Sequence, residues 1–151
     1  MGDFPQVSKA LVAVKGETVD EEAVKLACTL AKVRKGKVYV VYVIEVKRAL
    51  PLDAEVEPEI EKGEQVLKRA ERAAHDAGYS VETELLQARE AGPAIVDEAV
   101  ERSVDTIFMG MPYKKRFGEF ELGTAVPYVL KNAPCRVLLW RETVEADAKE
   151  K

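Results

Sequence analysis

The sequence predicts an α/β protein in which a parallel sheet is covered by helices on both sides. Short apolar segments alternate along the chain with longer segments whose apolar residues recur at helical spacing. This alternation is typical of strands joined by right-handed helical crossovers. The chain has 151 residues, the length of one ordinary domain. We therefore expect residues 1–151 to form a single domain, arranged as a three-layer sandwich.

Five segments are predicted to be strands. Four of them are apolar at consecutive positions, which indicates that both faces of each strand are covered. The segment 81–86 instead alternates apolar residues with Glu82 and Glu84, which predicts a strand at the margin of the sheet with one polar face. The four apolar strands are expected at residues 10–14, 38–44, 106–109 and 137–140.

Four helices are predicted from their boundary residues and apolar spacing. The first begins at a capping-box pattern, in which the Thr18 hydroxyl and the Glu21 carboxylate both bind backbone amides. It is expected to end at Gly36, in the left-handed region that glycine adopts at low cost. The second helix begins near Pro58 and ends at Gly78. The third is expected to begin at Gly92 and Pro93, and the fourth to run from Gly123 and Thr124 to about Asn132.

Two segments are expected to lie outside the packed layers. Residues 47–57 form a long connection that contains Pro51 and several acidic residues, which is typical of a mobile, solvated loop. Residues 142–151 are mostly polar and are expected to form a frayed tail.

The composition excludes several classes of protein. Hydrophobic residues make up 47% and charged residues 33% of the chain, as in ordinary globular domains. The net charge of −4 argues against nucleic-acid or membrane-surface partners. The longest apolar run, residues 38–44, is too short to cross a bilayer, so we expect a cytoplasmic protein. Cys28, Cys135 and the single histidine, His75, form no metal-binding pattern, and no metal site is predicted.

Two loops are candidates for a binding site. In open parallel sheets, ligands bind beyond the carboxyl ends of the strands, where the chain order reverses. This rule selects residues 15–18, after the first strand, and residues 110–124, after the fourth. The second loop carries the basic run 114–116 and closes with Gly123 and Thr124 at a helix start. Free amides at a helix start, together with nearby cations, bind anions, which predicts a phosphate-sized ligand.

This second loop resembles the loop of the universal stress protein family. Nucleotide-binding members carry glycine, two residues, glycine, nine residues, and then Gly-Ser or Gly-Thr. In this chain Gly110, Tyr113, Gly123 and Thr124 stand in that register, and the resemblance extends over residues 9–140. It implies the adenine nucleotide alpha-hydrolase-like fold, with strand order 3-2-1-4-5 and two helices on each face. That order places the two candidate loops side by side.

Two positions depart from the pattern of the nucleotide-binding relatives. Tyr113 replaces the second glycine, and its Cβ disfavours a positive φ by roughly 1–2 kcal/mol. Lys15 stands where ATP-binding relatives carry an acidic residue near the ribose, and an ammonium group accepts no hydrogen bond. The resemblance therefore implies a degenerate nucleotide or phosphate pocket. Its retained residues are Gly110, Gly123, Thr124 and Val43, the last lying beside the adenine in relatives.

The resemblance implies a small regulatory protein of the stress response. ATP or another adenine nucleotide is the candidate ligand, or else another small phosphorylated molecule, with conventional ATP binding in doubt because of the two departures. The alternative is a protein-interaction module that binds no nucleotide because Tyr113 plugs the pocket. No Ser, His and Asp set gathers around the single histidine, so we do not expect an enzyme.

The last strand predicts how the chain associates with itself. The family's strand order places residues 137–140 at the edge of the sheet, although they are apolar on both faces. An exposed apolar edge favours pairing with another strand. We expect a homodimer in which Val137 and Leu139 meet their two-fold mates, as is common in the family.

Overall fold

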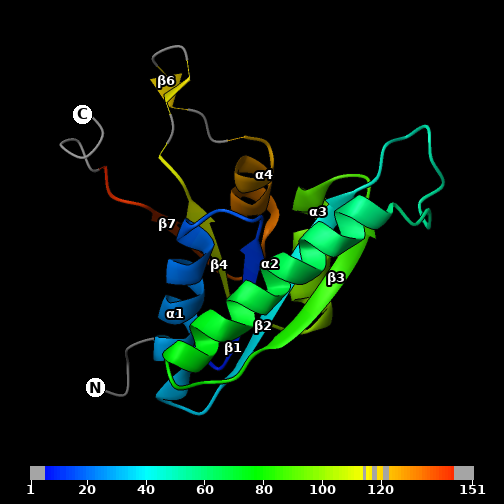
Figure 1. Ribbon diagram of the computed structural model, residues 1–151. Helices are drawn as coiled ribbons and strands as arrows, with labels where there is room; N and C mark the ends of the chain where they lie inside the picture. Colours follow the sequence, from blue (N-terminus) through cyan, green and yellow to red (C-terminus); the bar gives the residue numbers. More distant parts are fainter. Residues whose placement is uncertain (1–5, 114, 117–118, 121–122, 145–151) are drawn as a thin grey trace, which may run out of the picture.

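The computed structural model describes residues 6–113, 115–116, 119–120 and 123–144. These residues contain one sheet of five parallel strands in the order β3-β2-β1-β4-β7 (Figure 1), which confirms the predicted fold class and strand order. The strands are β1 (Lys9–Val14), β2 (Lys37–Glu45), β3 (Glu82–Ala88), β4 (Thr106–Met111) and β7 (Arg136–Arg141). The helices are α1 (Val19–Lys32), α2 (Glu57–Asp76), α3 (Ala91–Glu101) and α4 (Ala125–Asn132). A separate ribbon pairs β5 (Lys115–Arg116) with β6 (Glu119–Phe120).

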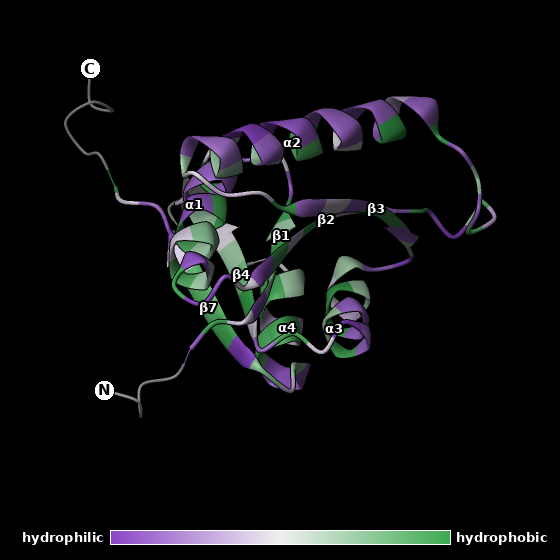
Figure 2. Ribbon diagram, turned by 90° about the horizontal axis from the view of Figure 1, so that it is seen from below, coloured by the Kyte–Doolittle hydropathy of each residue, from purple (hydrophilic) through white to green (hydrophobic). Residues whose placement is uncertain are grey.

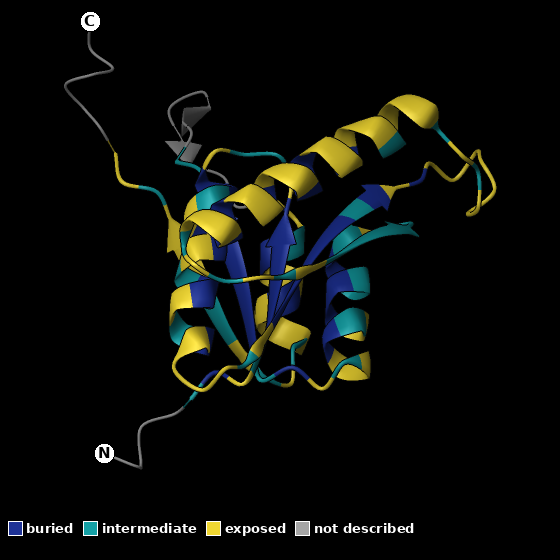
Figure 3. Ribbon diagram, turned by 60° about the horizontal axis from the view of Figure 1, so that its bottom comes forward, coloured by how far each residue is buried: buried dark blue, intermediate teal, exposed yellow. Residues whose placement is uncertain are grey.

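Two cores lie on opposite faces of the sheet. Helices α1 and α2 pack with the strand residues of one face, including Val12 and Phe108, and helices α3 and α4 pack with those of the other, including Leu11 and Ile107. Alternate residues of a strand point to opposite faces, which explains why consecutive strand residues are apolar. Figure 2 shows the hydrophobic stripes of the helices facing the sheet, and Figure 3 shows the central strands buried.

The two ends of α1 differ from the prediction. The Thr18 side chain makes no capping hydrogen bond, so the expected capping box does not form. At the other end, Lys35 and not Gly36 adopts the left-handed conformation, with a φ of 55°. Glycine is needed at position 36 for a different reason, because a Cβ there would lie 2.6 Å from the carbonyl oxygen of Ser8. A close approach of two backbone segments therefore selects Gly36.

The predicted tail and basic loop are described only in part. Glu142 continues beyond β7, and its N–H donates a hydrogen bond to the Met111 carbonyl, 2.9 Å away. Residues 145–151 of the predicted tail lie outside the described residues, as do Lys114 and Gly118 of the loop. Within the described part of the chain, every helix is too short or too polar to cross a bilayer.

Candidate functional site

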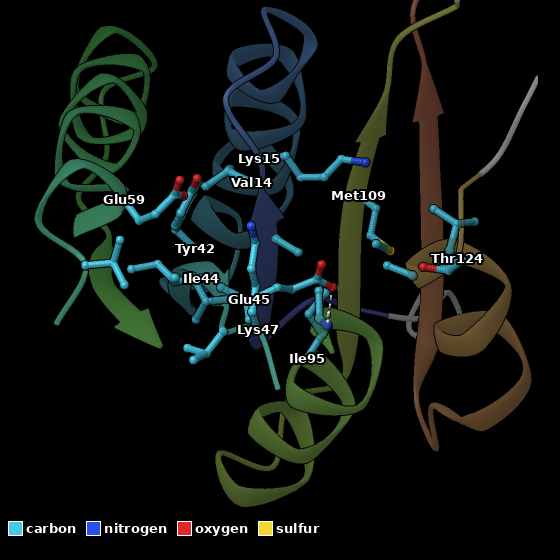
Figure 4. Close-up of a pocket in the computed structure, with 18 of the residues that line it drawn as sticks. Val14, Lys15, Tyr42, Ile44, Glu45, Lys47, Glu59, Ile95, Met109 and Thr124 are labelled. Carbon is cyan, nitrogen blue, oxygen red and sulfur yellow. Dashed lines mark hydrogen bonds between the residues drawn. The ribbon is translucent and has the colours of Figure 1, made fainter. Parts of the chain in front are cut away.

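A cavity of about 580 Å³ opens at the carboxyl edge of the sheet, between the ends of β1, β2 and β4 (Figure 4). The strand order reverses at this point, since β2 and β3 lie on one side of β1 and β4 and β7 on the other. The reversal sends neighbouring connections to opposite faces of the sheet and leaves space between them. Much of the cavity wall is apolar, including Ala13, Val41, Val43, Ile95, Met109 and Val126.

The cavity brings together four of the residues predicted from the sequence. Lys15 follows β1, Val43 lies near the end of β2, Gly110 lies near the end of β4, and Thr124 precedes α4. These residues are far apart in sequence but share one edge of the sheet because all the strands are parallel. The two candidate loops therefore meet at one cavity.

The two predicted glycines have different roles. Gly123 has a φ of 76°, and a Cβ there would meet nothing within 4 Å, so its backbone conformation is what favours glycine before α4. A Cβ at Gly110 would lie 3.1 Å from the Val19 carbonyl oxygen. Gly110 therefore allows β4 to pack closely against the start of α1.

Tyr113, which the alternative hypothesis from the sequence places as a plug of the pocket, lies beside β7 and is not among the residues that line the cavity. Its ring lies against the Arg141 guanidinium, with 4.9 Å between the guanidinium carbon and the ring centre. Its N–H donates a hydrogen bond to the Glu142 carboxylate at 2.9 Å. The chain after β4 turns toward the end of β7, so the tyrosine packs beside that strand and is absent from the cavity lining.

The polar groups of the cavity are unevenly distributed. Figure 4 shows the Lys15 side chain extending from β1 toward β4, on the side of the cavity where Thr124 lies. At the start of α3, the Glu45 carboxylate accepts a hydrogen bond from the Ala91 N–H at 2.8 Å. At the start of α4, the Thr124 side chain makes no capping hydrogen bond. The positive end of α3 thus faces a carboxylate, whereas the Thr124 side chain does not cap the start of α4.

Asp20 organises the loop that carries Lys15, and the prediction from the sequence missed it. The side chain lies in the first turn of α1 and is only 4% exposed. Its Oδ2 accepts hydrogen bonds from the N–H groups of Lys15, Gly16 and Glu17, at 3.0, 2.7 and 2.9 Å. An acidic residue just after a glycine-containing loop and inside a helix start is the signal that could have identified it.

Burial and hydrogen bonding act on Asp20 in opposite directions. Burial raises the pKa of this carboxyl above its ordinary value of 3.8, while the hydrogen bonds from Gly16, Lys15 and Glu17 lower it by less. Its second oxygen, Oδ1, is buried without a hydrogen-bond partner in the described part of the chain. The loop is therefore held by a carboxyl group that burial makes easier to protonate.

The structure defines a class of α/β protein in which a parallel sheet lies between two layers of helices and a cavity opens at the carboxyl edge of the sheet. Among the described residues, no group of three or more His, Cys, Asp or Glu side chains is placed to hold a metal ion. The sequence profile of the Universal stress protein family matches residues 7–141. The chain belongs to the universal stress protein family.

Individual relatives agree with this assignment. Universal stress protein MJ0531 of Methanocaldococcus jannaschii is 33% identical over 137 residues, which are 87% of this chain and 80% of that protein. A universal stress protein structure from Archaeoglobus fulgidus has a TM-score of 0.74 at 24% identity, covering 87% of this chain and 96% of its own. A universal stress protein from the same organism, in complex with dAMP, has a TM-score of 0.69 at 25% identity, with coverages of 87% and 95%.

Proposed function

We propose that this chain is a regulatory binding protein whose cavity holds an adenine nucleotide or another small phosphorylated ligand. The observation that supports the proposal is an apolar cavity wall that ends at Lys15, Thr124 and the start of α4, groups whose charge and dipole suit an anion. Pockets of roughly 300–1,000 Å³ with apolar walls and a few polar groups are typical of small-molecule sites. The dAMP complex of the Archaeoglobus fulgidus relative supports the choice of an adenine nucleotide.

The cavity favours one orientation of such a ligand. The base would lie against the apolar side chains of Val43 and Ile95, and the phosphate would lie at the start of α4, within reach of Lys15. Glu59 lies on the side of the cavity away from Thr124, and Glu45 lies beside Ile95 at the start of α3, where their negative charges would repel a phosphate. The described residues lining the cavity include no serine, cysteine or histidine.

Titration calorimetry with ATP, AMP and cyclic AMP tests the proposal. Wild-type protein should bind at least one of them, and Lys15→Met and Thr124→Val should each weaken binding about tenfold. The physical reason is that a hydrogen bond to a charged group contributes about 1.5–3 kcal/mol, and about 1.4 kcal/mol is tenfold in affinity. The effect of Lys15→Met should shrink at high salt, because ions screen exposed charges.

Lys25→Met is the matched control. Lys25 is an exposed lysine of α1 that does not line the cavity, so its replacement removes the same charge elsewhere and should leave the affinity unchanged. Wild-type protein that gives no heat with any of the three nucleotides would overturn the nucleotide proposal. An equal loss of affinity in Lys25→Met would show that only the overall charge matters.

We also propose that the chain forms a homodimer through β7. This strand lies at the edge of the sheet, where its outer backbone groups are available to a second strand. Leu139 and Trp140 are 36% and 41% exposed, whereas Val137 packs partly against the core of α3 and α4. Leu139 is therefore the more important contact of the two residues predicted for the interface.

Leu139→Lys is expected to give a monomer, because a lysine ammonium buried against its two-fold mate would be desolvated and repelled. Light scattering should show the mass of the wild-type particle falling by half, to that of one 16.7 kDa chain. Leu52→Lys is the control, since Leu52 is a leucine of similar exposure, 47%, in the loop between β2 and α2, on the other side of the sheet's central strand from β7. A wild-type monomer, or a Leu139→Lys dimer, would contradict the proposal.

A further inference from the structure

The segment that follows β2 in the chain forms one wall of the cavity. Residues 46–56 run from the end of β2 to the start of α2, and we term this segment the strap. Its residues Val46, Lys47, Leu50 and Val56 line the cavity. The strap has only short turns of its own, closed by hydrogen bonds from the Leu50 N–H to the Lys47 carbonyl and from the Ala54 N–H to the Pro51 carbonyl.

Arg89 holds the first half of the strap. Its Nη1 donates to the carbonyl oxygens of Lys47 at 2.7 Å and Leu50 at 2.9 Å, with a longer contact to Val46 at 3.3 Å. One guanidinium nitrogen thus hydrogen-bonds to several carbonyl oxygens that point to the inside of the same turn. A planar guanidinium suits this task because it presents several donors in a fixed arrangement.

Gln87 holds the second half of the strap. Its Nε2 donates to the carbonyl oxygens of Leu52 at 2.8 Å and Ala54 at 2.9 Å. Gln87 lies near the end of β3, and Arg89 follows two residues later. Residues two apart in an extended segment point to the same side, so both side chains reach the strap from one edge of the sheet.

The position of the strap decides what the cavity presents to a ligand. Figure 4 shows the Lys47 side chain reaching into the cavity, while Leu50 and Val56 add apolar surface to the wall. The strap carbonyls bound by Arg89 and Gln87 are those of the residues that build this wall or flank it. Without the two side chains, the strap would keep its connection to β2 and α2 but not its path between them.

We propose that Arg89 and Gln87 are positioning residues that hold the strap as the outer wall of the ligand cavity and thereby set the affinity of the site. The inference rests on the proposed function, because it assigns to both residues a role in binding the same ligand. Neither side chain lines the cavity, so each acts through the strap. A ligand would have to order the strap itself when the two residues are removed, which weakens binding.

Hydrogen exchange of the ligand-free protein tests the first step. In the Arg89→Met, Gln87→Met double variant, the Leu50 and Ala54 amides, which close the two turns of the strap, should exchange about tenfold faster than in wild type, while those of β1 and β4 should be unchanged. Arg48→Met is the matched control, because Arg48 is an exposed arginine on the strap and its loss should leave the exchange unaltered. Unchanged exchange in the double variant would overturn the proposal.

Ligand binding tests the second step. The probes are AMP and 1-anilinonaphthalene-8-sulfonate, a dye with an apolar body and one anionic group that needs no nucleotide specificity. Both should bind the double variant about tenfold more weakly than wild type, with an unchanged melting temperature and partial recovery in Arg89→Lys.

The two proposals fail separately. If wild type binds the dye but no nucleotide, the nucleotide-binding function is contradicted. The strap proposal is then tested by the dye alone, which should bind the double variant more weakly than wild type. If the double variant binds AMP or the dye as tightly as wild type, or if affinity falls only together with the melting temperature, the strap proposal is overturned.

Discussion

Phe108→Ala is expected to lower the free energy of unfolding by about 3–5 kcal/mol, measured by urea unfolding. Phe108 lies in the middle of β4, opposite Val12 of β1 and Leu138 of β7, and is 1% exposed. Among the described residues, it is the largest of the fully buried side chains. Truncation would leave a void beneath α1 that neighbours on a rigid sheet cannot fill.

Two further results check this interpretation. Val100→Ala, at a position 55% exposed, should change stability by less than about 0.5 kcal/mol. Phe108 belongs to the core of α1 and α2, whereas the adjacent Met109 lines the cavity on the opposite face. Folded Phe108→Ala protein should therefore keep its ligand affinity. A loss of stability below about 1 kcal/mol would show that the core re-packs around this position.

Asp20→Ala is expected to cost about 2–3 kcal/mol, because it leaves the N–H groups of Lys15, Gly16 and Glu17 without their common acceptor. Asp20→Asn should cost less, since an amide oxygen can still accept from the loop. Both variants should also weaken ligand binding, because Lys15 lies on this loop. Equal stability of the alanine variant and wild type would contradict the role assigned to Asp20.

The pH dependence of these variants has a definite sign. The pKa of Asp20 is raised in the folded chain, so the folded state binds this proton more tightly than the unfolded state does. The stabilising effect of that proton is complete below pH 3.8, the ordinary pKa of an aspartate and hence that of the unfolded state. It is lost as the pH rises through the higher pKa of the folded state. As the pH falls from about 7 to about 4, the free energy of unfolding of wild type should therefore increase relative to that of Asp20→Asn. A constant difference across urea unfolding curves in this range would contradict the prediction.

Local patterns were sufficient to predict the five strands of the main sheet and the four helices, but not the short ribbon of β5 and β6. The consecutive apolar residues of β2 and β4 and the alternation in β3 have the periods that strands impose. Gly78 and Gly123, which mark predicted helix boundaries, lie close to the end of α2 and the start of α4 and both adopt positive φ. The strand order came from the family resemblance, and with it the meeting of Lys15, Val43, Gly110 and Thr124 at one cavity.

Contacts between distant segments could not be predicted in the same way. Gly36 faces the Ser8 carbonyl, and Tyr113 lies beside Arg141. Each of these depends on which atoms of other segments lie within a few ångströms. A residue type restricts its possible partners but does not select among them.

The sequence by itself determined the α/β class and the positions of the strands and helices, because these follow from the spacing of the hydrophobic residues. It also determined which edge of the sheet carries the candidate site, because the carboxyl ends of parallel strands share one edge. Only the tertiary structure decided which groups line the cavity and what holds them. The strap over 46–56 is the clearest case, since Arg89 and Gln87 are ordinary polar residues in sequence. They hydrogen-bond to the strap only because the end of β3 lies beside the point where the chain leaves β2.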